Sequence, residues 1–263
     1  MNNKIVALCY DFDKTLTTDD MQAYGLIPKL GFEKPVDCWK KRMKFSEATG
    51  CESSLSLLRL FMDECVSKNI SLTRKFLNDM GKNIEFYKGV DTWFDHINKY
   101  AKSKGVKLEH YVISAGNYEI MEGCPIFKYF KNVFACEYLY DKNGIAYWPK
   151  NIVNYTLKTQ YLFRISKGVM NLVDDQEVNK KTVHKRIDFC NMVYLGDGNT
   201  DIPCMTLVKS NGGTSISVYD IENKAIALKL KSDDRVNYAC ASDYSEGSQI
   251  DKVVKLVIDK CSL

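Results

Sequence analysis

Short apolar runs along the chain predict the strands of a parallel sheet. Residues 4–10 and 108–114 are continuous apolar runs, as in strands that are buried on both faces. Later strand patterns alternate with helical ones: strands at 132–140, 145–148, 191–195, 214–218 and 235–240, and helices at 153–167, 201–209, 221–230 and 248–259. Residues 141–144, Asp-Lys-Asn-Gly, predict a hairpin turn. The alternation predicts an α/β fold in three layers, with a parallel sheet between two layers of helices.

The gap between the first two strands predicts an inserted helical domain. About a hundred residues separate these strands, whereas a crossover needs only about a dozen. Within the gap, apolar residues recur at spacings of three and four at Leu55, Leu58, Phe61, Met62 and Cys65. Ser71 is a candidate N-cap for a helix that runs to Met80 and stops at Gly81, and residues 91–104 predict the helix before the second strand. We therefore expect a core at residues 1–18 and 89–263 and a helical cap at 19–88.

Composition places the chain among globular proteins and gives no reason to expect nucleic acid or membrane partners. Hydrophobic residues make up 45% and charged residues 27% of the chain, so it has enough apolar side chains for a full core. The net charge of +4 is small, and no long run of basic residues accompanies it. Charges interrupt every apolar stretch before it reaches the roughly 18 residues that a membrane span needs. The N-terminal apolar run is also too short for a signal peptide.

Cysteine and histidine usage narrows the chemistry further. The chain has ten cysteines without a CxxC pair, and several lie in apolar runs. We interpret them as reduced thiols of a cytoplasmic protein. The only histidines, His96, His110 and His184, supply too few ligands or bases for a histidine metal site or a serine–histidine triad. Trp39 and Trp93 are expected to take part in the packing of cap or core.

Polar residues of one kind follow three of the expected strands. The first strand is followed by Asp11-Phe12-Asp13-Lys14-Thr15, the second by Ser114-Ala115-Gly116-Asn117, and a later one by Gly196-Asp197-Gly198-Asn199-Thr200-Asp201. The carboxyl ends of adjacent parallel strands meet in one crevice, where such sheets bind their ligands. Four carboxylates in that crevice repel one another and need a cation. All-oxygen ligation favours Mg²⁺.

Residues of these types can together transfer a phosphoryl group. A carboxylate can attack phosphorus and form an aspartyl-phosphate, and a second carboxylate can protonate the leaving group. A hydroxyl, backbone N–H groups and a lysine can hold the phosphoryl oxygens. A calcium-binding EF-hand loop is excluded, because Leu16 and Gln22 stand where that loop needs a glycine and an acidic residue.

The ordered set of motifs resembles that of the haloacid dehalogenase-like (HAD) phosphohydrolases. Residues 11–15 match the family's first motif, DxDxT, residues 112–114 match the second, a hydrophobic strand ending in Ser or Thr, and residues 196–201 match the fourth, GDGxxD. The third motif is a lysine, for which Lys158 and Lys167 compete. We favour Lys158 because it opens the expected helix, which makes residues 168–188 a local extension. The resemblance implies a Rossmann-like core with an inserted cap.

The resemblance also implies roles for the acidic residues. Asp11 would be the nucleophile and a metal ligand, and Asp13 the general acid/base, with its backbone carbonyl on the metal. Thr15 would orient Asp13. Asp197 would be the other direct metal ligand, with Asp201 in support. An aspartate at the position of Asp13 marks the phosphatase branch of the family.

Further residues would hold the transferring phosphoryl group. The resemblance gives this role to Ser114 with Ala115 and Gly116 from the second motif, and to Lys158. Lys158 would also neutralise Asp11.

The position of the insert resembles the type 1 cap of the phosphoserine phosphatase-like branch. In that branch an acidic residue after the nucleophile binds the substrate's amino group, and a cap arginine binds its carboxylate. Asp20 has a comparable offset, and Arg59 or Arg42 could supply the guanidinium. Asp20 is shorter than the usual glutamate, and Thr200 replaces the usual asparagine of the fourth motif. An alternative for Asp20 is that it caps a helix.

These observations predict a cytoplasmic, Mg²⁺-dependent phosphatase that acts on a small phosphorylated metabolite through an aspartyl-phosphate. Two alternatives stay open: a phosphotransferase of the same fold, and a non-catalytic Mg²⁺-binding regulatory module. The sequence does not indicate an oligomeric state.

Overall fold

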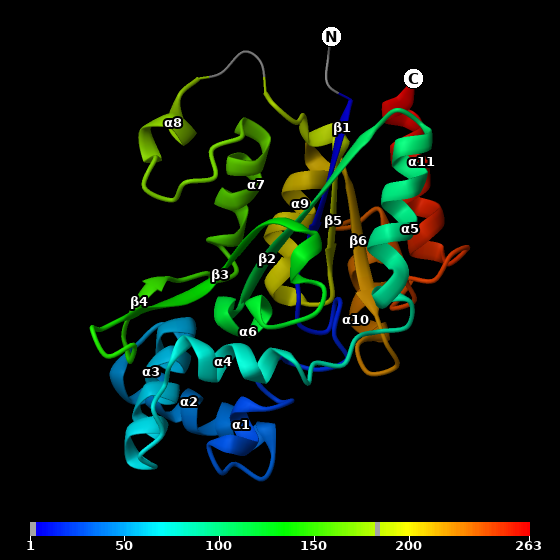
Figure 1. Ribbon diagram of the computed structural model, residues 1–263. Helices are drawn as coiled ribbons and strands as arrows, with labels where there is room; N and C mark the ends of the chain where they lie inside the picture. Colours follow the sequence, from blue (N-terminus) through cyan, green and yellow to red (C-terminus); the bar gives the residue numbers. More distant parts are fainter. Residues whose placement is uncertain (1–3, 182–184) are drawn as a thin grey trace.

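The computed structural model describes residues 4–181 and 185–263, which form an α/β core with a group of helices at one end (Figure 1). His184 lies outside the described residues. Seven strands form one sheet in the order β4-β3-β2-β1-β5-β6-β7. Their bounds are β1 Ile5–Tyr10, β2 Lys107–Asn117, β3 Phe130–Tyr140, β4 Ala146–Asn151, β5 Met192–Gly196, β6 Thr214–Tyr219 and β7 Tyr238–Ala241. All neighbours pair parallel except β3 and β4, which pair antiparallel as the expected hairpin.

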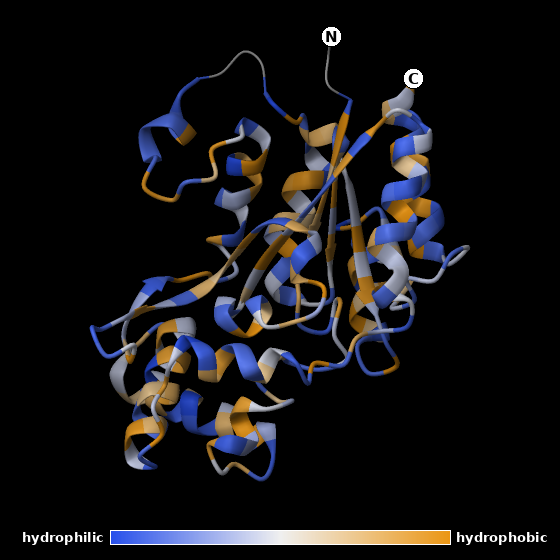
Figure 2. Cartoon of the chain, viewed as in Figure 1, coloured by the Kyte–Doolittle hydropathy of each residue, from blue (hydrophilic) through white to orange (hydrophobic). Residues whose placement is uncertain are grey.

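β1 lies in the middle of the sheet, and its side chains alternate between the two layers of helices. All six of its residues are buried, as its apolar sequence predicts. The hydroxyl of Tyr10 accepts a hydrogen bond from the indole of Trp93 in α5 (Val90–Ser103). The neighbouring Cys9 points to the other face, toward Cys204 in α9 (Ile202–Ser210). The three-layer prediction is confirmed, and the hydrophobic strands lie inside more hydrophilic helices (Figure 2).

Helices cover the sheet on both sides. α5 packs against α11 (Gln249–Ser262), and α7 (Lys158–Lys167) packs against α9 on the opposite face. α10 (Lys224–Ser232) covers β6 and β7. The expected helix at 153–167 begins five residues late, at Lys158. No helix within the described ranges is long and apolar enough to cross a membrane.

Short helices fill the connections between these elements. They are α6 Tyr118–Glu122, α8 Asp175–Asn179 and the 3-10 helices Phe127–Tyr129, Phe189–Asn191 and Asn199–Asp201. The extension after α7 contains α8. It is anchored by the buried guanidinium of Arg164, which donates to the carbonyls of Asn171 and Leu172 and pairs with Asp175.

The segment between β1 and α5 consists of helices at the end of the sheet where the parallel strands finish (Figure 1). They are α1 Leu26–Lys29, α2 Pro35–Thr49, α3 Ser53–Ser67 and α4 Arg74–Gly81. α3 buries Leu58, Phe61 and Cys65 as expected, but Leu55 is exposed. The division into a core at 1–18 and 89–263 and a cap at 19–88 stays a prediction, and we use "cap" for α1–α4.

The start of α4 differs from the expectation. Thr73 caps the helix by accepting a hydrogen bond from the backbone N–H of Phe76 at 3.0 Å, so Ser71 is not the N-cap. Gly81 is the last helical residue and does not follow the helix as a stop. Serine and threonine are both good N-caps, so composition alone does not choose between positions two residues apart.

The β3–β4 hairpin connects the core to the cap. Its turn forms an antiparallel bridge between Ile145 and Thr73, and the N–H of Ala146 donates to the carbonyl of Leu72 at 2.9 Å. The hydroxyl of Tyr138 in β3 donates to the carbonyl of Leu58 in α3 at 2.9 Å. The hairpin therefore contacts both α3 and the start of α4.

All ten cysteines, each within the described residues, are free thiols. Seven of them are buried, among them Cys9, Cys136 and Cys204, where they pack as small apolar side chains.

Glu109, a buried carboxylate near the start of β2, is expected to stabilise the folded protein at neutral pH. Glu109 accepts hydrogen bonds from Arg186 at 2.6 Å, Lys131 at 2.5 Å and the Tyr111 hydroxyl at 2.6 Å. Burial alone would raise the pKa of Glu109, but these donors hold it below its usual value. A lowered carboxylate pKa contributes stability above the unfolded pKa of about 4.3, and this contribution is lost as the pH falls toward the folded pKa.

We therefore expect Glu109→Gln to lower the free energy of unfolding by about 2 kcal/mol at pH 7. The difference from wild type should shrink at pH 3, because this lies below the unfolded pKa of about 4.3, where the unfolded wild-type chain gains a proton on Glu109 and is stabilised relative to the native state. Urea denaturation at the two pH values measures both effects, with the exposed Glu222→Gln as the control. Equal stability of wild type and Glu109→Gln at pH 7 would contradict the assignment.

Candidate active site

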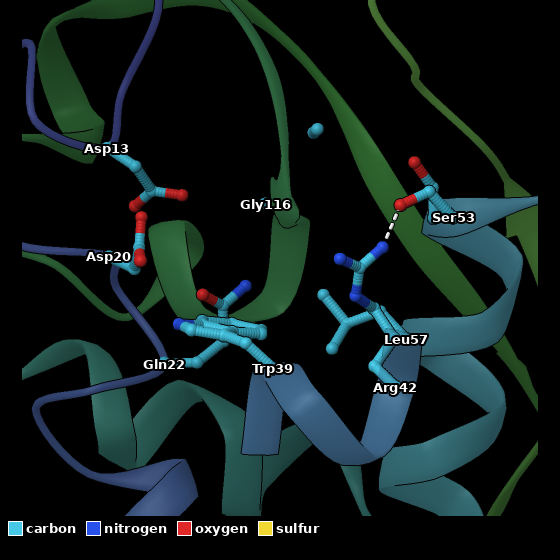
Figure 3. A pocket seen from close by; sticks show the side chains of 10 residues that line it. Asp13, Asp20, Gln22, Trp39, Arg42, Ser53, Leu57 and Gly116 are labelled. Carbon is cyan, nitrogen blue, oxygen red and sulfur yellow. Dashed lines mark hydrogen bonds between the residues drawn. The ribbon is translucent and has the colours of Figure 1, made fainter. Parts of the chain in front are cut away.

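The loop after β1 presents two aspartates in different directions. The N–H of Asp11 donates to the carbonyl of Leu195 in β5, and a carboxylate oxygen of Asp11 accepts from the N–H of Phe12 at 2.7 Å. Asp13 accepts a hydrogen bond from the N–H of Met21 at 2.7 Å and turns its carboxylate toward a pocket below the sheet (Figure 3). The backbone bends sharply after Asp13, since Lys14 has a φ of 54°.

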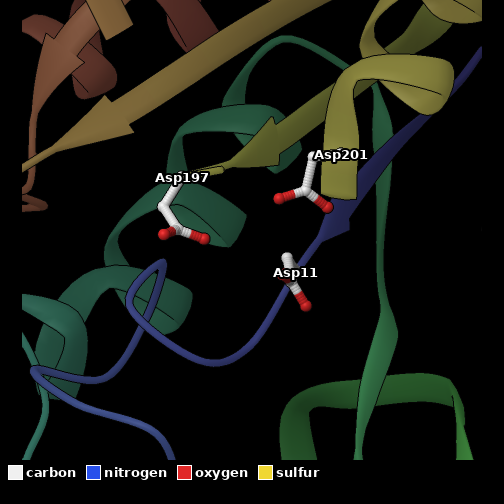
Figure 4. Close-up of side chains that lie close together, drawn as sticks. All are labelled: Asp11, Asp197 and Asp201. Atoms are coloured by element: carbon white, nitrogen blue, oxygen red, sulfur yellow. The ribbon is translucent and has the colours of Figure 1, made fainter. Parts of the chain in front are cut away.

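Three aspartates from separate elements come together beside this loop. Oxygen atoms of Asp11, Asp197 and Asp201 lie within 4.8 Å of one another (Figure 4). Asp11 follows β1, Asp197 follows β5, and Asp201 ends the 3-10 helix before α9. The structure thus brings the first and fourth motifs together, as the parallel sheet predicts. The Asp13 carboxylate is not one of these three, and the expected ligand there is its backbone carbonyl.

Mutual repulsion and burial perturb these carboxylates. Burial, followed by the charges of Asp201 and Asp11, raises the pKa of Asp197 to about 8. Burial and the charge of Asp201 likewise raise the pKa of Asp11 to about 6, against the opposing effect of Lys158. Burial, with the charges of Asp20 and Asp11, raises the pKa of Asp13 well above its usual range. The cluster therefore carries more negative charge than its surroundings compensate.

Lys158 lies inside this cluster and is almost completely buried. Its ammonium nitrogen lies 2.9 Å from a carboxylate oxygen of Asp11 and 2.7 Å from one of Asp201, which also accepts from the hydroxyl of Tyr194 at 2.7 Å. Burial opposes a charged lysine, but the two carboxylates raise the pKa of Lys158 above its usual value. The competing Lys167 lies at the other end of α7, where it donates to the carbonyls of Val178 and Lys180. Of the two lysines, the structure therefore brings Lys158 to the aspartates.

Close packing explains two of the motif glycines. A Cβ on Gly196 would lie 2.5 Å from the carboxyl carbon of Asp201, so a side chain there would displace that carboxylate. A Cβ on Gly116 would lie 2.1 Å from the methyl carbon of Met21 and 3.1 Å from a carboxylate oxygen of Asp13. The end of β2 can therefore approach Asp13 only with glycine at this position.

The second motif follows the expected strand, although β2 runs on through Asn117. Ser114 is buried and accepts a hydrogen bond from the N–H of Gly116 at 3.1 Å, while Ala115 is exposed at the rim of the pocket. The hydroxyl of Thr15 is buried and has no hydrogen-bond partner in the described part of the chain. The structure therefore shows no hydrogen bond by which Thr15 would orient Asp13 as expected.

A pocket of about 350 Å³ opens between the motif loops and the cap (Figure 3). It is lined by Asp13, Asp20, Gln22, Trp39, Arg42, Ser53, Ser54, Leu57, Ala115 and Gly116. Asp20 lies in the pocket, and the capping alternative for it is wrong, because the next helix begins at Leu26 with Gly25 as its N-cap.

Arg59, one of the two arginines expected to bind substrate, does not line the pocket. It is two residues beyond Leu57 on α3, about 200° around the helix, and it pairs with Asp63 on the exposed side. Arg42 and Trp39 of α2 both face the pocket, one turn apart. The sequence reveals this spacing but not which face of α2 meets the core. Trp39 therefore packs against the core, as expected, and also lines the pocket.

The residues of the cluster fit a hard divalent cation. Only carboxylate and carbonyl oxygens are offered, which suits Mg²⁺. Asp11 and Asp197 would hold it together with the backbone carbonyl of Asp13. The Asp201 oxygen nearest Lys158 already accepts hydrogen bonds from Lys158 and Tyr194. Asp201 would therefore support the site without being a direct ligand of the cation. Tyr194, which no motif singled out, fixes Asp201 from a buried position on β5.

Comparison with known proteins identifies the fold. No family model matches the chain. The chain is 25% identical over 271 residues to an uncharacterized protein of Borreliella burgdorferi, and the match covers 94% of each. A HAD family hydrolase from Salmonella enterica serovar Typhi aligns over 99% of this chain and 73% of its own, with a TM-score of 0.60 at 14% identity.

Two structures of phosphoserine phosphatase are similar to about the same degree. The apo form gives a TM-score of 0.58 at 16% identity, covering 95% of this chain and 98% of that one. A phospho-aspartyl intermediate analogue gives 0.56 at 17% identity, with the same coverage. The chain therefore has the haloacid dehalogenase-like fold. Within that class its architecture is the one found in phosphoserine phosphatases.

Proposed function

We propose that the protein is a Mg²⁺-dependent phosphatase that hydrolyses a small phosphomonoester through an aspartyl-phosphate intermediate. The observation that carries the proposal is the position of Lys158, which is buried between Asp11 and Asp201 while Asp13 faces the adjoining pocket. This arrangement combines a nucleophile, a fixed positive charge and an acid next to space for a leaving group. The HAD-like fold supports the same chemistry.

The first half of the reaction transfers the phosphoryl group to Asp11. A carboxylate oxygen of Asp11 attacks phosphorus, and the bond from phosphorus to the leaving-group oxygen breaks. Asp13 gives its proton to that oxygen. The raised pKa of Asp13 supports this role, because burial and the nearby charges of Asp20 and Asp11 favour the protonated form that a general acid needs.

The second half releases phosphate. Asp13, now a carboxylate, takes a proton from water, whose oxygen attacks the phosphorus. The bond between phosphorus and Asp11 breaks, which frees inorganic phosphate and restores the Asp11 carboxylate. Lys158 and Ser114, with the N–H groups near Ala115, would hold the phosphoryl oxygens throughout. A bound Mg²⁺ would offset the repulsion between the Asp11 carboxylate and the phosphate.

The two alternatives differ from hydrolysis in the fate of the phosphoryl group. A phosphotransferase would pass it to an acceptor other than water. A regulatory module would bind Mg²⁺ without turnover, and it would have no use for an acid such as Asp13 in the pocket. We also propose the cytoplasm as the location, which the ten free thiols support, since reducing compartments keep cysteines unpaired.

The proposal is tested by measuring phosphate release from a panel of small phosphomonoesters. The panel contains p-nitrophenyl phosphate, phosphoserine, sugar phosphates and nucleoside monophosphates. We expect release that requires Mg²⁺ and stops with EDTA. Asp197→Asn should raise the Mg²⁺ concentration for half-maximal activity by about tenfold or more, because it removes an expected ligand.

Asp233→Asn, at an exposed aspartate that follows α10 and lies outside both the pocket and the aspartate cluster, is the matched control and should behave as wild type. Release that is indifferent to EDTA would remove the metal from the proposal. Release only in the presence of a second acceptor would favour the phosphotransferase, and Mg²⁺ binding without release from any ester would favour the regulatory module.

A further inference from the structure

The wall of the pocket opposite Asp13 combines an aromatic ring with an arginine. Trp39 and Arg42 come from α2, and Leu57 comes from α3. Trp39 is half-buried and lines the pocket, and Figure 3 shows its ring edge-on, with the side-chain amide of Gln22 drawn next to it in this view. A flat apolar surface of this kind packs well against the face of another ring.

The acidic side of the pocket is poorly suited to a substrate ammonium group. The carboxylate of Asp20 lies 3.7 Å from the ammonium nitrogen of Lys14, which is also 3.5 Å from Asp19. Lys14, which is shared with Asp19, therefore compensates part of the charge of Asp20. An amino group on the substrate would have to compete with this lysine, so Asp20 is better placed to accept hydrogen bonds from neutral donors.

The other polar groups of the pocket can both donate and accept. The guanidinium of Arg42 donates to the hydroxyl of Ser53, which fixes its plane and leaves further N–H groups free to donate. Gln22 donates to Asn117 at 3.0 Å, and its amide oxygen remains an acceptor. Hydroxyl groups, which donate and accept at once, match this mixture better than a single charged group does.

The size of the pocket suits a small leaving group. Its volume of about 350 Å³ is near the lower end of the roughly 300–1,000 Å³ typical of small-molecule sites. One ring with its hydroxyl groups suits this space, whereas a nucleoside contains a base as well as a sugar. From the flat wall, the partly compensated acid, the mixed polar groups and the size, we infer that the substrate is a phosphorylated monosaccharide whose ring packs on Trp39. This inference rests on the proposed phosphatase function.

The test compares substrates with and without a ring. Acetyl phosphate is the reference, because it has no ring and its acetate leaving group needs no proton from Asp13. For the wild-type enzyme with Mg²⁺, we expect kcat/KM for a hexose or pentose phosphate to exceed that for phosphoserine and for nucleoside monophosphates by about tenfold or more. Trp39→Ala should lower kcat/KM for the sugar phosphate about tenfold more than for acetyl phosphate. Trp39→Phe, which keeps a flat ring, should restore most of it.

Trp148→Ala is the matched control, because Trp148 lies on the exposed edge strand β4 and is 64% exposed. It should leave all substrates unaffected. A second readout does not depend on turnover. Calorimetry in Mg²⁺ measures the binding of the sugar phosphate to the unreactive Asp11→Asn enzyme. There, Trp39→Ala should weaken binding by the same factor.

The outcomes separate this inference from the function on which it rests. Failure to hydrolyse acetyl phosphate, sugar phosphates and every other ester would contradict the phosphatase itself. Turnover of acetyl phosphate with preference for phosphoserine or a nucleoside monophosphate would overturn the monosaccharide assignment alone. An equal loss on all substrates in Trp39→Ala would show that Trp39 supports the fold of the cap and does not contact a ring.

Discussion

Replacing Asp11 by asparagine is expected to lower kcat by about 10⁴-fold or more. An amide is a poor nucleophile, so the aspartyl-phosphate cannot form, even though the side chain keeps its shape. A rapid acid quench of the wild-type enzyme with radiolabelled substrate should trap a phosphorylated protein, and the variant should give none.

The same substitution should leave the fold intact. Asp11 is buried beside Asp197 and Asp201, and burial with the charge of Asp201 raises its pKa to about 6. Removing one negative charge relieves repulsion in the metal-free protein, at the cost of one partner of Lys158. We therefore expect the thermal midpoint in EDTA to stay within a few degrees of wild type. Asp233→Asn again serves as the control. Full activity in Asp11→Asn would rule out Asp11 as the nucleophile.

Gly123→Ala is expected to destabilise the protein by about 3 kcal/mol. A Cβ on Gly123 would lie 1.9 Å from the carbonyl oxygen of Asn78, and one on Gly81 would lie 2.0 Å from that of Ile120. α4 of the cap and α6 of the core thus touch backbone to backbone, and neither side can shift without moving a helix. The φ of Gly123 is −79°, which alanine adopts freely, so without this contact the substitution would be neutral or stabilising.

Urea denaturation measures the expected loss. Gly105→Ala is a matched control, because its φ is +69° and a Cβ there meets open space; it should cost only about 1–2 kcal/mol. α6 begins directly after β2, whose last residues include Ser114, so Gly123→Ala should also lower kcat/KM. A variant as stable as wild type would show that the two helices separate at little cost.

The motifs at the strand ends could be predicted from sequence because strand direction determines where they meet. Asp11 and Asp197 come together since β1 and β5 are adjacent and parallel. The place of Lys158 at a helix start favours it over Lys167, and of these two lysines only Lys158 reaches the aspartates. For these residues, the residue types and the regular order of the sheet were sufficient to predict that they meet in one site.

Residues whose position depends on how whole helices pack could not be predicted in the same way. Arg59 and Arg42 are equally plausible as cationic residues of the cap, and the rotation of α2 and α3 against the core decides that Arg42 lines the pocket. The contacts of the β3–β4 hairpin with the cap also join residues far apart in the chain, such as Tyr138 and Leu58. No periodicity within one segment reveals such pairs.

The β3–β4 hairpin has a consequence for how the protein could acquire new substrates. It secures α3 and α4, so the cap does not rely on α2 for its attachment. α2 has 15 residues, of which Cys38 alone is buried among those described, and substitutions at exposed positions usually change stability by less than about 0.5 kcal/mol. The exposed positions of the helix that carries Trp39 and Arg42 can therefore be substituted at little cost to the fold, which makes this helix a natural segment for redesigning specificity by directed evolution.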